Sequence, residues 1–134
     1  MRHCYVLRVF TRVSGDGRHV GGNHLGVITD VTGLPDRVMQ EIATELGFSE
    51  TIYVDWRAPG NPAARIFTPG AEMPFAGHPL VGAGWLLQVI GPGGPTAITC
   101  GVGDVAIEMT GNGAAYLSLR AGGTRIEWWS PERE

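Results

Sequence analysis

The sequence predicts a mixed α/β (α+β) domain in which β-strands wrap around one central, apolar helix. The segment 77–91, GHPLVGAGWLLQVIG, is apolar on nearly every side, and a helix without a polar face is buried all round. The chain also has 21 glycines and 9 prolines in 134 residues. This glycine content is about twice the usual share of roughly 7%, which indicates many tight turns. The two observations favour a β-rich envelope around a helical core.

A second, amphipathic helix is expected over residues 33–47, GLPDRVMQEIATELG. Pro35 suits the first turn of a helix, and Gly47 can form a left-handed C-cap. The apolar side chains of this helix recur every fourth residue, at Val38, Ile42 and Leu46. This spacing predicts one buried stripe along the helix.

The rest of the chain is typical of strands and turns. Runs of β-branched and aromatic residues predict strands at 4–11, 25–31, 50–56 and 61–70. A Gly-rich loop is expected at 12–24, and the segment 96–120 is predicted as two strands joined by a hairpin at Gly-Asn-Gly, 111–113. The length fits a single domain, 1–134, with no linker or repeat.

Composition excludes several classes of function. The formal net charge of -3 and the isoelectric point of about 5.8 argue against nucleic-acid binding, which usually needs a basic face. All ten basic residues are arginines, so no lysine of this chain can form a Schiff base, anchor pyridoxal phosphate or make a Walker-A phosphate contact. No apolar run reaches the roughly 18 residues of a membrane span. The first ten residues do not resemble a signal peptide, so a cytoplasmic location is expected.

Glu50 is the first candidate for chemistry. It lies between Ser49 and Thr51 at the junction of the predicted helix and strand. A glutamate there is either an ordinary loop charge or a group that moves a proton. Apolar neighbours, Leu46, Phe48 and Ile52, are expected to form a pocket around it, and desolvation in such a pocket helps a carboxyl group both to accept and to give a proton near neutral pH.

His78 is the second candidate. It lies between Gly77 and Pro79, at the amino end of the predicted central helix. Gly77 lets backbone approach a ligand closely, and the free N–H groups of a helix N-terminus favour a carboxylate or a developing enolate. The alternative is a structural or capping imidazole. His19 and His24 have no acidic or cysteine partner at ligand spacing, so no metal site is expected.

The order of these motifs resembles a known family. An early VFT is followed by GGN before a strand, then by MQEIATELGFSET, then by RIFTPGAEMPFAGHPLVGAGWLL. This order, over roughly residues 5–120, is similar to the amino-terminal half of the PhzF-like isomerases and epimerases of phenazine biosynthesis. The resemblance implies one half of the diaminopimelate-epimerase fold, in which two pseudo-symmetric α/β domains each curve a sheet strongly around a central helix.

The resemblance also implies a mechanism that needs no metal or organic cofactor. Glu50 matches the family's general acid/base, which moves a proton between carbons of a small carboxylated metabolite. Gly77 and His78 match a pair that binds and orients the substrate, and Asn23 and Ser49 are likewise expected at the substrate site. One departure is His24, which stands where the family usually has proline.

The second departure is length, because a complete family member is about twice as long and places its active site between two domains. The resemblance therefore implies a dimeric assembly, with the site completed by a second half-domain chain in a heterodimer or by a second copy in a homodimer. The alternative is a non-catalytic half-domain that binds a small molecule or serves assembly. Trp128 and Trp129 are expected either to cover a core edge or to form an interface.

Overall fold

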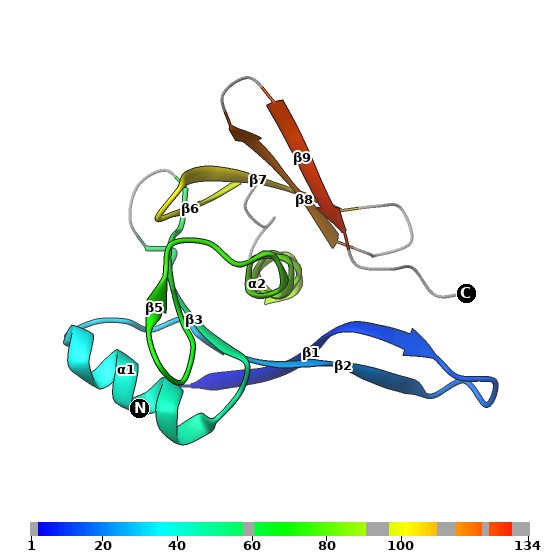
Figure 1. Ribbon diagram of the computed structural model, residues 1–134, viewed down its shortest axis with the longest axis horizontal. Coiled ribbons are helices and arrows are strands. Elements are labelled where there is room, and N and C mark those ends of the chain that lie inside the picture. Colours follow the sequence, from blue (N-terminus) through cyan, green and yellow to red (C-terminus); the bar gives the residue numbers. More distant parts are fainter. Residues whose placement is uncertain (1–2, 58–60, 91–96, 110–114, 122–123, 130–134) are drawn as a thin grey trace.

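The computed structural model describes residues 3–57, 61–90, 97–109, 115–121 and 124–129 of the chain. These residues form nine strands and two helices (Figure 1). The strands are β1 (Cys4–Val13), β2 (His19–Ile28), β3 (Glu50–Asp55), β4 (Ala63–Phe67), β5 (Glu72–Met73), β6 (Ala97–Cys100), β7 (Gly103–Met109), β8 (Ala115–Ala121) and β9 (Thr124–Trp129). The helices are α1 (Asp36–Leu46) and α2 (Gly77–Ile90).

All strands belong to one mixed sheet that curves around α2. The strand order is β1-β2-β3-β4-β6-β7-β8-β9, and β5 pairs with β4 off this path. The β2–β3 and β4–β6 pairs are parallel, and the other pairs are antiparallel. Figure 1 shows α2 end-on, with β1 to β3 on one side of it and β6 to β9 on the other. The predicted curved sheet around a central apolar helix is confirmed.

The main core lies between α2 and the concave face of the sheet. Its members come from α2 and from strands β1, β2, β3, β4, β6 and β7, among them Val9, Leu25, Ile52, Leu87 and Ile107. The helix is not buried on every side, however, because Trp85, Val89 and Ile90 are 39%, 60% and 38% exposed. In the part of the chain that the structure describes, no helix is both long and apolar enough to cross a membrane.

A smaller core lies on the convex face, under α1. Met39 and Ala43 are buried there against Ile28, Tyr53 and Phe67. The buried stripe is therefore one residue further along than the predicted Val38–Ile42–Leu46 stripe, all three of which are only half-buried. Gly47 ends the helix in the left-handed conformation, with φ of 67°, as predicted.

Polar contacts fix α1 against the neighbouring strands. The Tyr53 hydroxyl donates a hydrogen bond of 2.6 Å to the carbonyl of Met39. The Arg65 guanidinium on β4 lies 2.7 Å from both the Asp36 and the Glu72 carboxylates. These bonds hold the first half of α1 against β3 and β4, and β3 begins with Glu50.

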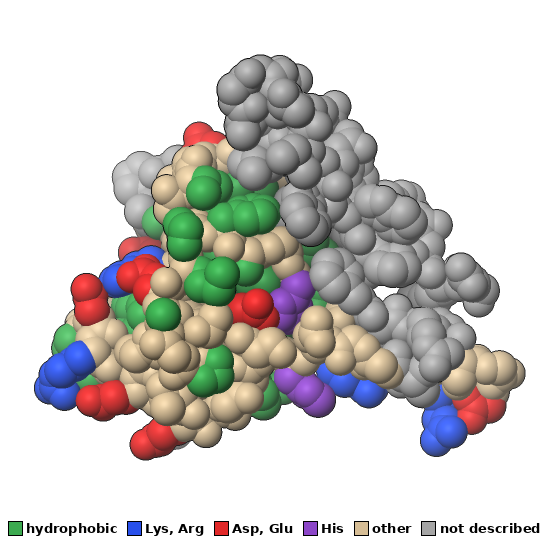
Figure 2. Space-filling view, in the orientation of Figure 1, with side chains coloured by type: hydrophobic (Ala, Val, Ile, Leu, Met, Phe, Trp, Pro, Cys, Tyr) green, Lys and Arg blue, Asp and Glu red, His purple; other side chains and the backbone are tan. Residues whose placement is uncertain are grey.

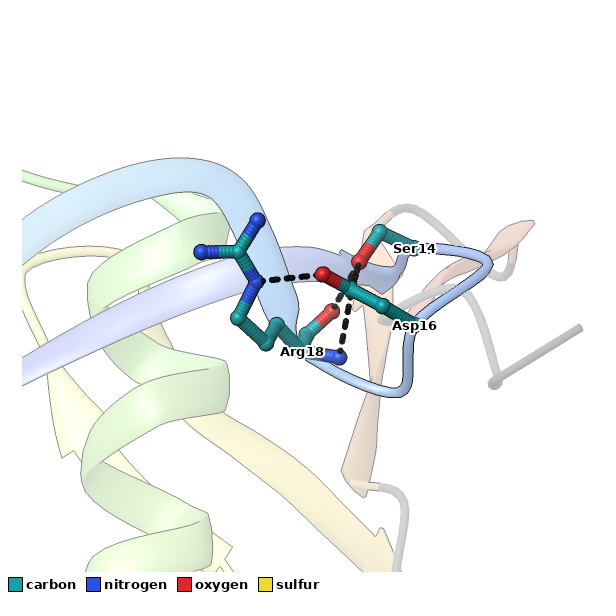
Figure 3. Close-up of polar contacts among 3 residues, drawn as sticks. All are labelled: Ser14, Asp16 and Arg18. Carbon is teal, nitrogen blue, oxygen red and sulfur yellow. Dashed lines mark hydrogen bonds and ion pairs between the residues drawn. The ribbon is translucent and has the colours of Figure 1, made fainter.

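The first hairpin is longer than the sequence predicted. Residues 12–24 were expected to form a loop, but β1 runs to Val13 and β2 begins at His19. The turn between them is closed by polar contacts of Ser14, Asp16 and Arg18 (Figure 3). Gly21 and Gly22 lie within β2 with φ of 74° and 79°, a conformation that glycine adopts without strain, and Gly21 pairs with Thr11 of β1. Glycine in this stretch therefore belongs to a strand, not to a loop.

The carboxyl-terminal part also differs from the prediction. The segment 96–120 contains three strands, because a turn at Gly101 and Val102 separates β6 from β7. The Gly-Asn-Gly segment 111–113 lies outside the described residues, although β7 and β8 on either side of it do pair antiparallel. Trp128 and Trp129 belong to β9, which was not predicted, and their side chains lie outside the described residues.

Candidate active site

Glu50 and His78, the two residues that the sequence singled out, are in contact. Glu50 is the first residue of β3, and His78 is the second residue of α2. The Oε2 atom of Glu50 lies 2.8 Å from Nδ1 of His78, and the two side chains are 18% and 8% exposed. Oε2 is buried, and its approach to the ring is a close electrostatic contact, not a well-aligned hydrogen bond. Figure 2 shows an acidic and a histidine side chain meeting on one face of the molecule.

The fold brings this pair together by strand alternation. Side chains on β3 point alternately to the two faces of the sheet. Ile52 and Val54 lie in the core around α2, so Glu50 shares the face that α2 covers. The parallel pairing of Leu25 with Glu50 fixes the start of β3 against β2. Glu50 therefore opens a strand, and it is not the loop charge that the simpler sequence interpretation allowed.

Burial and charge act on His78 in opposite directions. Desolvation lowers the pKa of His78 below its ordinary value and is the largest influence. The negative charge of Glu50 and a hydrogen bond to the backbone of His24 both act to raise it. Since desolvation prevails, we take His78 to be a neutral imidazole beside the Glu50 carboxylate at pH 7.

The position of His78 on its helix adds a further electrostatic influence. His78 lies in the first turn of α2, which runs from Gly77 to Ile90 and has no acidic residue in that turn. The first N–H groups of a helix lack partners within the helix and carry partial positive charge. The Glu50 carboxylate and the His78 imidazole at such a helix end form an arrangement suited to proton transfer and to holding an anion.

The other predicted site residues are related to this pair by chain position and by sheet face. Ser49 directly precedes Glu50 and is exposed, and Gly77 directly precedes His78 and is half-buried. Asn23 is exposed on β2, two residues before Leu25. By strand alternation Asn23 shares the face of Leu25, which packs in the core around α2. Ser49 and Gly77 are thus chain neighbours of the contacting pair, and Asn23 lies on the sheet face that also carries Glu50.

The predicted pocket around Glu50 is only partly correct. Ile52 is fully buried on the same sheet face as Glu50. Leu46 and Phe48 lie instead over Gly26, where a Cβ atom would meet their side chains at 3.3 and 3.4 Å. Gly26 alternates with Leu25 along β2, so this contact is on the convex face. Leu46 and Phe48 therefore do not surround the Glu50 carboxylate.

Sequence reasoning missed one contact beside the site. The rings of His24 and Phe48 are stacked, with centroids 5.8 Å apart and an interplanar angle of 22°. The two residues are 24 positions apart in the chain, and no local pattern pairs them. The only available signal was that His24 replaces the proline usual in the resembled family.

A groove of about 540 Å³ lies elsewhere, between β4, β5 and β6. It is lined mostly by small and apolar side chains, with Arg65 and Glu72 at its edge. Both charged groups are engaged in the ion pairs described above. Within the described ranges, no three His, Cys, Asp or Glu side chains gather in a group that could hold a metal ion.

Comparisons with known proteins show which family the chain resembles. The family model described as phenazine biosynthesis-like protein matches residues 8–122. Trans-2,3-dihydro-3-hydroxyanthranilate isomerase of Pseudomonas chlororaphis is 38% identical over 110 residues, which are 81% of this chain and 38% of that protein. An uncharacterized isomerase of Mesorhizobium japonicum is 46% identical over 86 residues, 61% of this chain and 26% of that protein.

Solved structures show the same relation. The PhzF-family phenazine biosynthesis protein of Bacillus anthracis superposes with a TM-score of 0.69 at 30% identity, over 87% of this chain and 39% of that one. The PhzF-family protein of Enterococcus faecalis gives a TM-score of 0.74 at 26% identity, over 88% and 44%. The chain thus spans less than half the length of these relatives. With a family match over most of its residues, the chain belongs to the phenazine biosynthesis-like family that includes PhzF.

Proposed function

We propose that this chain is one subunit of a cofactor-independent isomerase or epimerase that moves a proton between carbon positions of a small carboxylated metabolite. The observation that carries the proposal is the 2.8 Å contact between Glu50 and His78 at the start of α2. Support also comes from relatives that are named isomerases, one of them acting on trans-2,3-dihydro-3-hydroxyanthranilate.

In the proposed reaction Glu50 is the general acid/base. Its carboxylate takes a proton from a carbon of the substrate, the C–H bond breaks, and the electron pair enters the conjugated system as an enolate-like anion. Glu50 then returns the proton to another carbon, which gives isomerisation, or to the other face of the same carbon, which gives epimerisation. No electrons are gained or lost overall, so the balance needs no redox partner.

The neighbours of Glu50 would hold the substrate and its anion. The N–H groups at the start of α2 would stabilise the negative charge that develops, since they are already oriented before the reaction. His78, Gly77, Asn23 and Ser49 would bind and orient the substrate. A neutral His78 can donate or accept one hydrogen bond without competing with Glu50 for the proton.

We further propose that a second half-domain supplies the other wall of the site. Relatives are more than twice as long as the matched region, and the chain covers 39% and 44% of two solved relatives. The family resemblance implies that the two halves of a longer relative contribute unlike residues to one cleft, which favours a different second chain over a second copy. A site between two walls also excludes water, which strengthens the electrostatic interactions inside it.

The test replaces Glu50 by glutamine, which keeps shape but cannot accept the proton. The assembled protein is incubated in D₂O with trans-2,3-dihydro-3-hydroxyanthranilate, and deuterium incorporation at carbon is followed by mass spectrometry. Loss of the general base should slow incorporation by about 10²- to 10⁴-fold. Glu45→Gln is the matched control, because Glu45 is an exposed carboxylate on α1, and its rate should equal that of the unmodified protein.

Undiminished exchange in Glu50→Gln would reject Glu50 as the base. A protein that binds the compound but exchanges no deuterium in any form would support the alternative, a non-catalytic binding or assembly module. Circular dichroism of both variants checks that the loss of activity is not a loss of folding.

A further inference from the structure

His24 lies close to the Glu50–His78 pair, but its ring is on the opposite face of the sheet. Leu25 belongs to the core around α2, so His24 and Gly26 on either side of it face the convex surface. There the exposed His24 ring stacks on Phe48, with centroids 5.8 Å apart. Phe48 is two residues before Glu50 in the turn that leads into β3. A substrate in contact with Glu50 would therefore not touch the His24 ring.

Gly26 provides the surface on which Phe48 lies. A Cβ atom at this position would be 3.4 Å from the Phe48 ring and 3.3 Å from Leu46, tighter than ordinary van der Waals contact. The absence of a side chain at Gly26 lets the end of α1 and the following turn lie flat against β2. Two contacts with β2 thus hold the Phe48 ring: the stack with His24 and the packing over Gly26.

The same short piece of β2 touches both members of the pair through its backbone. Leu25, between His24 and Gly26, pairs in parallel with Glu50. The backbone of His24 accepts a hydrogen bond from the His78 ring. One strand segment therefore positions His78 directly and positions Glu50 through both the strand pairing and the Phe48 stack.

We propose that His24 is a positioning residue, whose stack on Phe48 sets the distance between the Glu50 carboxylate and His78. The hydrogen bond from the His78 ring to the backbone of residue 24 does not depend on the side chain there. Substitution of the His24 side chain therefore alters only the stack on Phe48. In His24→Ala the turn that carries Phe48 loses one of its two supports, and Glu50 is no longer held at one distance from His78. The functional meaning of this distance rests on the proposed acid/base role of Glu50, but the distance itself is testable without turnover.

The test measures the electrostatic coupling between the two residues in the intact chain. Titration of His78 by NMR is compared with and without Glu50→Gln. The charge of Glu50 raises the pKa of His78, so Glu50→Gln should lower it. In the His24→Ala background this decrease should shrink by about half or more, as expected when contacting residues are uncoupled. His24→Phe, which can still stack on Phe48, should restore the full decrease.

His3→Ala is the matched control, since His3 is also an exposed histidine but precedes β1 and lies far along the hairpin from residue 24. It should leave the effect of Glu50→Gln unchanged. An undiminished effect in His24→Ala, even with a lower melting temperature, would overturn the proposal and leave His24 a merely stabilising residue. A lack of isomerase activity would refute only the proposed function, because this titration requires no substrate.

Discussion

At the residue scale, His78 shows how the fold sets a protonation state by opposing influences. Burial removes water from the ring and disfavours its charged form, while the adjacent Glu50 carboxylate and the His24 backbone favour it. Burial prevails, so the folded protein holds His78 with a lowered pKa. A histidine that stays neutral beside an acid can orient a substrate while the acid alone takes the proton.

The lowered pKa of His78 makes a prediction about stability. The ordinary pKa is 6.5, and it applies to the unfolded chain. Below that pH the unfolded chain binds a proton at His78 that the folded chain does not, so the free energy of unfolding falls as pH decreases until the folded pKa is passed. The free energy of unfolding is measured with urea at about pH 7.5 and at about pH 5.5. Its decrease between these two pH values should be larger for the unmodified protein than for His78→Asn. Equal losses in the two proteins would contradict the lowered pKa.

Single residues also show how far the sequence could predict the site. Glu50 and His78 could be identified because each lies in a motif at an element boundary, and the structure brings them together. The faces of Leu46 and Phe48 could not be predicted, because the turn between α1 and β3 reorients the chain and local spacing does not record that rotation. The stack of Phe48 on His24 was equally hidden, since it joins positions 24 residues apart.

At the scale of elements, α2 depends on two glycines for its approach to the sheet. A Cβ atom at Gly82 would lie 2.5 Å from Leu25 and 2.8 Å from Val9, and one at Gly84 would lie 2.5 Å from Ile107. Gly82 and Gly84 therefore face opposite parts of the curved sheet, β1 and β2 on one side and β7 on the other. The helix is central because it can be approached closely from both sides.

Gly82→Ala should consequently destabilise the protein. Overpacking a filled core costs about 1–3 kcal/mol, and alanine recovers up to about 1 kcal/mol through its better helix propensity. The net loss in the free energy of unfolding should be about 1 kcal/mol, measured by urea denaturation. Val89→Ala on the exposed side of the same helix is the control and should change stability by less than about 0.5 kcal/mol. A stabilised Gly82→Ala protein would mean that α2 does not pack as closely as described.

The predicted strands and loops were wrong mainly at glycines, because glycine occurs both in turns and within paired strands. In β2 the residues Gly21 and Gly22 were assigned to a loop, yet both lie within the strand and Gly21 pairs with Thr11 of β1, because long-range strand pairing overrides their local preference for turns. At Gly101 the opposite occurred, and a predicted continuous strand is broken by the turn between β6 and β7. That turn lies against Pro74, whose Cα would be 2.7 Å from a Cβ at position 101. Neither tertiary contact is visible in the local sequence.

At the scale of the whole molecule, one curved sheet and its helix present Glu50 and His78 as one side of a candidate site. Both helices and the sheet could be predicted from amphipathic and apolar patterns, and the resemblance supplied the curvature. The second half-domain that we propose as the opposite wall matches no residue of this sequence, so local patterns here carry no information about it. The proposed assembly therefore has to be tested with the partner present.

Reconstitution provides that test. The isolated chain should show no exchange of deuterium into trans-2,3-dihydro-3-hydroxyanthranilate, because a one-walled site neither excludes water nor completes the substrate contacts. Addition of a second half-domain that matches the remaining part of the relatives should restore exchange, with activity saturating at a one-to-one ratio and both chains eluting together in size-exclusion chromatography. The Glu50→Gln chain should form the same complex without activity, which separates assembly from catalysis. A stable homodimer of this chain with full activity would contradict the heterodimer and would place two Glu50 side chains in one assembly.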